Sequence, residues 1–322
     1  MAETFSSILI IDWRRLQDPT AKSKGLDDLR EAIFVVGFLY LTNHGLEVRS
    51  LTFRSMLANT SRISFEKSTQ HYLADFKARC DMINSRSFVG KQYDFGTPRM
   101  KTWTEDQGIW WWLEGNSQQF MQYVSKCLSL LLDTFVAFKG NFKQLKFIKY
   151  PQALLDSQGV GPHKNSSWLF TFLSQDNTSE LQVLNKSGDW INAPPIEGSL
   201  IVNIQQGLET VTGGICAATT HRVFTRYSIP FFLGVRMDPT TEQLRESAAH
   251  IVDKIPVSDD RKKRAVDVPS KFLSPLYSCF GEAYLRNRIL SPPERTEAIF
   301  IKVLYILPHP LPEPENRTYS QT

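Results

Sequence analysis

Short apolar runs separated by polar turn clusters fill the chain from about residue 145 to 235, and they restrict the possible fold more than any other feature. Clusters such as Asp176-Asn-Thr-Ser and Lys186-Ser-Gly-Asp carry the residue types that favour turns. Several short strands at this spacing are typical of an all-β barrel or sandwich. We therefore predict strands over Leu145–Tyr150, Leu169–Leu173, Leu181–Leu184, Leu200–Ile204 and Ser228–Val235.

The segments on either side of this region are mixed. Apolar residues recur at three- and four-residue spacing in several windows, which predicts amphipathic helices. The Pro-rich stretch from residue 308 to 314 is predicted to be disordered. The expected helices are 26–36, 48–62, 117–138 and 241–251, and the expected strands are 8–11 and 37–41.

Two histidines and one asparagine have the pattern of a metal site. His163 and Asn165 lie two residues apart, so their side chains share a face if the segment is extended. His221 follows far enough along the chain for a strand to cross a sheet and return. Neutral imidazoles suit Fe(II), and one oxygen donor completes a facial set that leaves other coordination positions open. Arg226 and Ser228, also two apart, can offer a guanidinium fork and a hydroxyl to a carboxylate.

Composition excludes several other classes. The net charge of +4, from 37 basic and 33 acidic residues, is too small and dispersed to indicate nucleic-acid binding. Cys80, Cys127, Cys216 and Cys279 are widely spaced, which indicates reduced thiols and neither a disulfide framework nor a zinc site. We find no signal-peptide pattern and no apolar run of the roughly 20 residues that a membrane helix needs. We expect a cytoplasmic protein with no membrane partner, and the sequence is silent on its oligomeric state.

An ordered series of motifs surrounds these residues and extends over most of residues 8–290. Together the motifs resemble the iron(II)/2-oxoglutarate-dependent dioxygenases, in the branch that also holds isopenicillin N synthase. The style of the sequence resembles fungal members that tailor secondary metabolites. The motifs are Ile10-Ile-Asp12, Gly37-Phe38, Asn43-His-Gly45, Leu145-Lys-Phe-Ile-Lys-Tyr-Pro151, Gly161-Pro-His163, Leu181-Gln-Val183, Val202-Asn-Ile204, His221-Arg-Val223, Arg226-Tyr-Ser228 and Gly281–Arg288.

The resemblance implies a mainly β fold, with a double-stranded β-helix (jelly-roll) core and flanking α-helices. It places His163 and His221 at the family's two histidine ligand positions. It gives Arg226 and Ser228 the role of binding the carboxylate of 2-oxoglutarate, the co-substrate that accompanies Fe(II). Tyr150 falls where the family often has a tyrosine that contacts co-substrate or substrate, although a role as a barrel-wall aromatic is equally compatible.

The resemblance also divides the chain and predicts its activity. Residues 1–140 form a mixed α/β N-terminal region, 141–238 the jelly-roll core, and 239–322 a C-terminal helical region with a disordered tail. The implied enzyme is an oxidoreductase that hydroxylates, desaturates or cyclises a small organic molecule, in secondary-metabolite biosynthesis. The substrate itself is not identified by any residue.

Asn165 is the departure with the largest physical consequence, because it replaces the aspartate of the family's H-x-D motif. An amide oxygen contributes a dipole where a carboxylate contributes a charge, and at a poorly solvated site that charge matters. The predicted ligand set is therefore His163, Asn165 and His221. Glu180 and Gln205 stand where the family usually has glycine, a residue that serves positive φ or close backbone approach.

These departures leave two alternatives open. One is a redox-neutral enzyme that binds and orients a substrate in the same pocket, with a metal as Lewis acid or with none. The other is a binding homologue that has lost catalysis. The cluster Trp110-Trp-Trp112 either faces the substrate or packs in the core.

Overall fold

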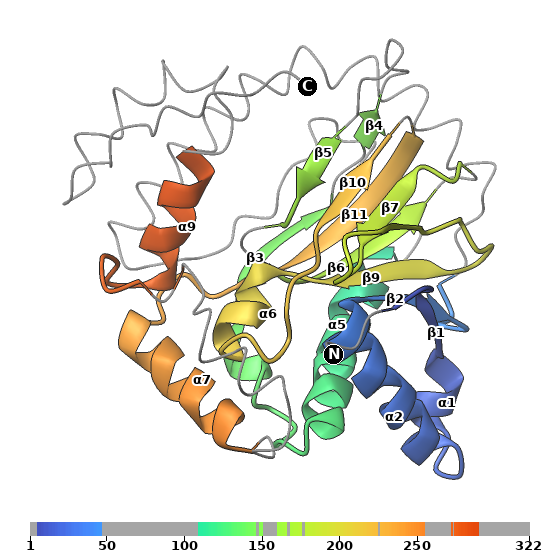
Figure 1. Ribbon diagram of the computed structural model, residues 1–322. Coiled ribbons are helices and arrows are strands. Elements are labelled where there is room, and N and C mark those ends of the chain that lie inside the picture. Colours follow the sequence, from blue (N-terminus) through green and yellow to red (C-terminus); the bar gives the residue numbers. More distant parts are fainter. Residues whose placement is uncertain are drawn as a thin grey trace.

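The computed structural model describes residues 5–46, 109–145, 148–150, 160–165, 168–175, 178–224, 226–254, 272 and 274–289. Within these residues the strands form two sheets that pack against each other, with helices around them (Figure 1). The predicted mainly β core with flanking helices is confirmed.

The larger sheet has seven strands, and its strand order shows how the N-terminal region joins the core. β1 and β2 from the N-terminal region pair in parallel, and β2 pairs with β9 of the core, so this region extends the core sheet. The order is β1 (Leu9–Asp12), β2 (Phe38–Thr42), β9 (Leu200–Ile204), β6 (Trp168–Gln175), β11 (Arg226–Val235) and β3 (Lys139–Leu145), with β4 (Ile148–Tyr150) also pairing with β11.

The smaller sheet has four strands, and it carries both histidines of the predicted site. Its order is β5 (Val160–His163), β10 (His221–Val223), β7 (Leu181–Leu184) and β8 (Trp190–Asn192), and every pair is antiparallel. The inner faces of the two sheets meet in an apolar cluster. This cluster includes Phe38, Leu173 and Ile201 of the larger sheet with Val183 and Val223 of the smaller one.

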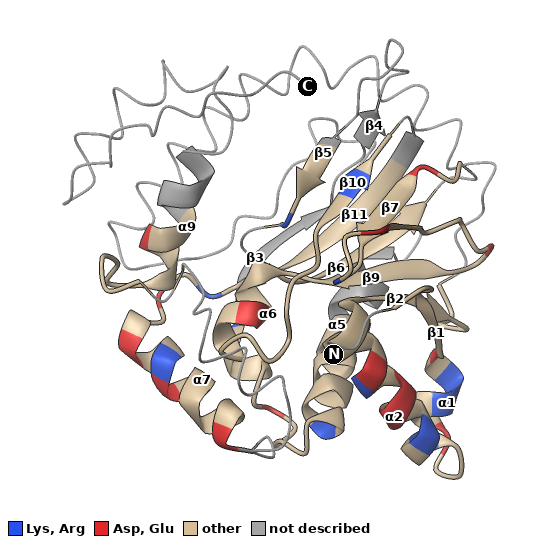
Figure 2. Ribbon diagram, in the orientation of Figure 1, with Lys and Arg blue, Asp and Glu red and all other residues tan. Residues whose placement is uncertain are grey.

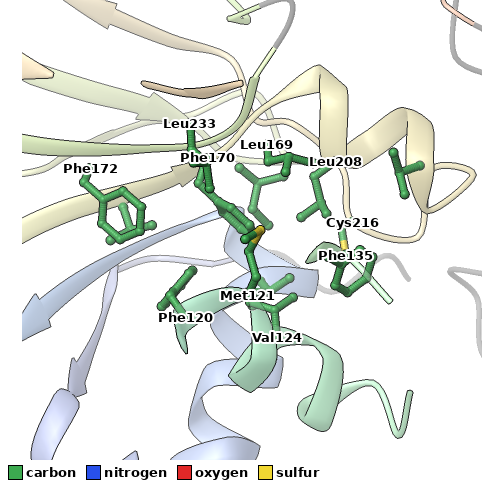
Figure 3. Close-up of a cluster of buried hydrophobic side chains, with 14 of the residues drawn as sticks. Phe120, Met121, Val124, Phe135, Leu169, Phe170, Phe172, Leu208, Cys216 and Leu233 are labelled. Atoms are coloured by element: carbon green, nitrogen blue, oxygen red, sulfur yellow. The ribbon is translucent and has the colours of Figure 1, made fainter. Parts of the chain in front are cut away.

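The outer face of the larger sheet packs on helix α5 (Ile109–Cys127) through aromatic side chains. The Phe120 ring lies edge-on to Phe170 and Phe172, with centroids 5.2 and 5.5 Å away. Figure 3 shows these rings with Met121 and Val124 of the same helix facing Leu169 and Leu233 of the sheet. Period-two alternation along β6 sends Phe170 and Phe172 to this face and Thr171 and Leu173 to the other.

The remaining helices lie around the two sheets. Figure 2 shows Lys, Arg, Asp and Glu residues concentrated on α1, α2 and α7, whereas the described strands carry few of them. Within the described residues, no helix combines the length and the apolar character needed to cross a membrane. The helices are α1 (Trp13–Gln17), α2 (Lys22–Glu31), the π-helix η1 (Ala32–Val36), the 3-10 helix η2 (Val136–Phe138), α6 (Gln206–Val211), α7 (Thr241–Lys254) and α9 (Phe280–Ile289).

One predicted helix is wrong in its extent. The pattern from 117 to 138 continues past Cys127, but α5 ends there, and Ser129 adopts a left-handed backbone conformation with φ of 55°. The amide of Leu130 turns back to the Ser125 carbonyl at 2.9 Å, which closes the last turn. The later apolar residues imitate helical spacing, yet Leu131 is 83% exposed, so they do not continue one buried stripe.

The other predicted elements have mixed outcomes. The helix predicted over 26–36 begins earlier, at Lys22, and its last five residues are the π-helix η1. The helix predicted over 48–62 and the tail at 308–314 lie outside the described residues. Residues 110–112 belong to α5, but their side chains are also outside the description, so the role of the tryptophan cluster stays untested.

Candidate metal centre

The smaller sheet brings the two predicted histidines face to face. His163 ends β5 and His221 begins β10, and the antiparallel register pairs these two residues directly. Their ring centroids lie 4.3 Å apart. Both strands are short, and the chain between them forms four further strands and α6, so residues far apart in the sequence come into contact.

Each histidine ring is oriented by a backbone carbonyl two residues earlier. Nδ1 of His163 lies 2.8 Å from the Gly161 oxygen, and Nδ1 of His221 lies 3.2 Å from the Thr219 oxygen. A carbonyl only accepts, so both contacts require the proton on Nδ1. The neutral tautomer of each ring then carries its lone pair on Nε2, which is the arrangement that metal-binding histidines use.

Asn165 completes the group from the loop that follows β5. Its Nδ2 lies 3.4 Å from Nε2 of His221, so the amide occupies the space in front of that ring. Its own backbone carbonyl accepts a hydrogen bond from the Gln206 amide at 3.1 Å, which ties the loop to the start of α6. The structure thus brings His163, Asn165 and His221 together, and their role as ligands stays a prediction.

The surroundings of His163 favour the form that binds a metal. Burial lowers the pKa of His163 below its ordinary value, while hydrogen bonding to the Gly161 carbonyl and the Asn165 side chain opposes that shift. A lowered pKa keeps the imidazole neutral at physiological pH, and only the neutral ring has a free lone pair.

His221 is also supported from the N-terminal region, which sequence reasoning missed. The Phe38 ring lies edge-on to the His221 ring at 5.2 Å. Thr219, whose carbonyl accepts from His221, donates its hydroxyl to the Val36 carbonyl at 2.7 Å. Gly37 permits this contact, because it has φ of 73° and a Cβ there would lie 2.4 Å from the Thr219 hydroxyl.

The residues predicted to bind 2-oxoglutarate lie on β11 and β4. Arg226 pairs with Tyr150 across these strands, and Ser228 pairs with Ile148 on β4 and Gln175 on β6. The Ser228 side chain is buried, and its hydroxyl has no hydrogen-bond partner among the described residues. The side chains of Arg226 and Tyr150 are outside the description, so their predicted contacts stay untested.

The backbone at Gln205 does not require a glycine. Its φ of −118° and ψ of 167° are extended, which any residue adopts. Of the two reasons offered for glycine here, positive φ is not observed, and close backbone approach stays untested. The side chain instead points into the protein, fully buried, and its amide nitrogen donates to the hydroxyl of Thr171.

The donor set fits a divalent transition metal such as Fe(II), although it differs from the usual one. Two neutral imidazoles with their protons on Nδ1 and one amide that can rotate can offer two nitrogens and one oxygen. The described residues contain no group of three or more His, Cys, Asp and Glu side chains that could hold a metal, and Asn165 is an amide. With both imidazoles neutral, the three predicted ligands carry no net charge.

Comparison with known proteins indicates the same family that the sequence motifs resemble. Residues 136–235 match the family model described as the 2OG-Fe(II) oxygenase superfamily, and this range holds every predicted site residue. A 2-oxoglutarate-dependent dioxygenase named frbJ, from Dothideomycetidae sp., is 30% identical over 345 residues, covering 90% of this chain and 91% of its own. A 2-oxoglutarate-dependent dioxygenase from Gibberella zeae is 27% identical and covers 91% of each chain.

Two solved structures have the same fold at low sequence identity. A putative 2OG-Fe(II) oxygenase family protein from Caulobacter crescentus is 18% identical, with a TM-score of 0.56 over 88% of this chain and 99% of its own. The rice dioxygenase for auxin oxidation is 20% identical, with a TM-score of 0.52 over 73% of this chain and 85% of its own. The predicted jelly-roll core is thereby confirmed.

Proposed function

The chain belongs to the 2OG-Fe(II) oxygenase superfamily, and we propose that it oxidises a small organic molecule in fungal secondary metabolism. The family uses Fe(II) with 2-oxoglutarate as co-substrate. Fungal relatives support an oxidoreductase of this kind, and they include two 2-oxoglutarate-Fe(II) type oxidoreductases named ppzC from Metarhizium species that are 44% and 42% identical over about a quarter of this chain. The reaction type, whether hydroxylation, desaturation or cyclisation, is part of the proposal.

The single observation that carries the proposal is the convergence of His163, Asn165 and His221. On both rings a backbone carbonyl accepts from Nδ1, which leaves the lone pair on Nε2, and the Asn165 amide nitrogen lies 3.4 Å from Nε2 of His221. We propose that these three side chains hold Fe(II), with Asn165 turning its oxygen toward the ion. Bound Fe(II) supplies open positions for 2-oxoglutarate and dioxygen, which is the oxidising chemistry of the family.

The rest of the proposed site binds the co-substrate and keeps it in place. We propose that Arg226 and Ser228 bind the carboxylate of 2-oxoglutarate far from the metal. The buried Ser228 hydroxyl, which has no partner within the described residues, supports this role, because a bound carboxylate would accept its proton. In a hydroxylation, one oxygen atom of dioxygen enters the substrate and the other enters succinate, and 2-oxoglutarate loses carbon dioxide.

Succinate release tests the proposed oxidation. Protein supplied with Fe(II), 2-oxoglutarate and dioxygen should form succinate, and removal of iron by a chelator should stop it until Fe(II) is restored. A Ser228→Ala variant should raise the KM for 2-oxoglutarate more than it lowers kcat. Absence of succinate above background with candidate substrates would contradict the proposal.

A redox-neutral enzyme is the second candidate, and the neutral ligand at Asn165 favours it specifically. Such an enzyme would bind and orient its substrate in the same place without consuming dioxygen. Anaerobic assays separate the two candidates, because turnover that survives without dioxygen favours the redox-neutral enzyme. A non-catalytic binding protein would show neither turnover nor an iron requirement for ligand binding.

A further inference from the structure

Three buried polar side chains form a patch on the inner face of the larger sheet, at the end that faces the predicted metal site. Asn203 follows Ile201 by two residues on β9, and Thr171 precedes Leu173 by two on β6, so both share the face of these inner apolar residues. The register pairs Asn203 directly with Thr171. Gln205 joins them by donating to the Thr171 hydroxyl.

The patch lies next to the proposed ligands. Asn203 pairs on its other side with Phe38, whose ring contacts His221. Gln206, the residue after Gln205, donates its amide to the Asn165 carbonyl at 3.1 Å. The polar patch is therefore connected to two of the three proposed ligands through a single neighbouring residue each.

Two polar atoms of this patch have no hydrogen-bond partner within the described part of the chain. They are Nδ2 of Asn203, a donor, and Oε1 of Gln205, an acceptor. Asn203 is 4% exposed and Gln205 is fully buried, so bulk water does not satisfy them. Buried polar groups without partners are costly, and their retention needs an explanation such as a ligand.

We propose that Asn203 and Gln205 bind a neutral amide of the substrate, with Asn203 donating to its carbonyl and Gln205 accepting from its N–H. A carboxylate fits less well, because the Gln205 oxygen would face its negative charge. A ketone or ether fits less well, because it has no N–H for Gln205. A cis amide, as in a lactam, offers donor and acceptor side by side. This inference rests on the proposed function in one respect, that the substrate lies beside the metal ligands.

The test uses a small lactam as probe and requires no turnover. Binding of δ-valerolactam to the full chain is measured by ligand-observed NMR, under anaerobic conditions, with and without Fe(II) and 2-oxoglutarate. N-Methyl-δ-valerolactam is the matched probe, because it keeps the carbonyl and loses the N–H. We expect the unmethylated lactam to bind about tenfold more tightly, the loss that one hydrogen bond of ordinary strength predicts.

Variants locate the site of that preference. Gln205→Met and Asn203→Leu should each abolish the preference for the N–H lactam. Asn203→Leu should leave the thermal midpoint of the ligand-free protein the same or raise it, because an unmet buried polar atom is removed, whereas Gln205→Met should lower it, because the Thr171 hydroxyl loses its donor. A purely structural role of Asn203 predicts the opposite for Asn203→Leu, a fall in the midpoint with the preference unchanged. Thr171→Val, which preserves shape, gives a second test if the larger changes prevent folding, and Gln118→Met on the exposed side of α5 is the control.

The lactam-binding test and the test of the proposed oxidation can fail independently of each other. A lactam preference that depends on Asn203 and Gln205 supports the site even if no iron binds and no succinate forms. Equal binding of the two lactams by the wild-type protein, no binding of either in the millimolar range, or a preference that survives all three substitutions would overturn it. Equal binding would mean that ordered water serves the two atoms.

Discussion

The two faces of the seven-stranded sheet differ in the side chains that they bury, although the same strands form both. The outer face meets α5 through Phe120, Phe170 and Phe172, and its described core is apolar. The inner face carries Thr171, Asn203 and Ser228 among apolar neighbours, and two of these have unmet polar atoms. Alternating residues of β6 and β9 thus separate the packing on α5 from the proposed binding face. The difference shows why a substitution one position away along a strand can have an unrelated effect.

The largest expected effect is on the outer face. Phe120→Ala should lower the free energy of unfolding by about 3–5 kcal/mol, because the phenyl ring is fully buried between two aromatic neighbours. Leu131→Ala, at a side chain that is 83% exposed, should change it by less than about 0.5 kcal/mol. Chemical denaturation measures both. Similar values for the two variants would mean that the packing on α5 does not secure the fold.

A substitution at the smaller sheet should act mainly on iron binding. His221→Ala should weaken Fe(II) binding by at least about 100-fold, more than the loss of an outer-shell partner of a ligand. His250→Ala on α7 is the matched control, because that histidine is exposed and lies on a different element. Equilibrium dialysis under anaerobic conditions gives both affinities. Equal iron binding by the two variants would remove His221 from the ligand set.

A substitution at Gly37 should affect both iron affinity and the stability of the fold. Gly37→Ala should weaken Fe(II) binding by about tenfold, because the new Cβ displaces Thr219 and with it the carbonyl that orients His221. Gly188→Ala is the matched control, since Gly188 also has positive φ but a Cβ there would meet nothing within 4 Å. Both should lose about 1–2 kcal/mol of stability to the left-handed backbone. A similar iron affinity in the two variants would contradict the support of His221 by Thr219.

The smallest expected effect is a difference in reactivity between two cysteine thiols, which does not change the fold. Burial raises the pKa of the Cys127 thiol to about 12, so at pH 8 this side chain stays protonated and unreactive. Cys279 is partly exposed. Site-resolved mass spectrometry after brief alkylation should find Cys279 modified and Cys127 intact, and faster modification of Cys127 would show that the α5 core opens readily.

Sequence patterns predicted most strands of the core, but β5, β8 and β10, each only three or four residues long, were missed. The prediction that His163 and His221 meet therefore rested on the family resemblance, because neither residue was placed on a predicted strand. The support of His221 could not be predicted, because Thr219 donates to a carbonyl 183 positions earlier in the chain. The end of α5 was also missed, since the apolar residues after Cys127 keep helical spacing while Ser129 reverses the backbone.

Gln205 shows a different limit of prediction from sequence. Comparison with the family pattern marked it only as a position where the family usually has glycine. In the structure the backbone is extended, and the side chain joins Thr171 in the interior. Its partner lies on β6, which pairs with β9 through long-range contacts that no local pattern contains. A residue that the sequence marked only as a departure from the family is therefore a candidate for substrate binding.

The measurement that tests the central claim most directly is an anaerobic Fe(II) titration of the wild-type protein and Asn165→Asp, each with saturating 2-oxoglutarate. We predict one Fe(II) per chain in both, bound about tenfold or more tightly by the variant, because a carboxylate adds a negative charge beside the cation where an amide adds only a dipole. An unchanged affinity would place Asn165 outside the coordination sphere. Failure of the wild-type protein to bind Fe(II) would contradict the claim that two histidines and an amide hold the metal.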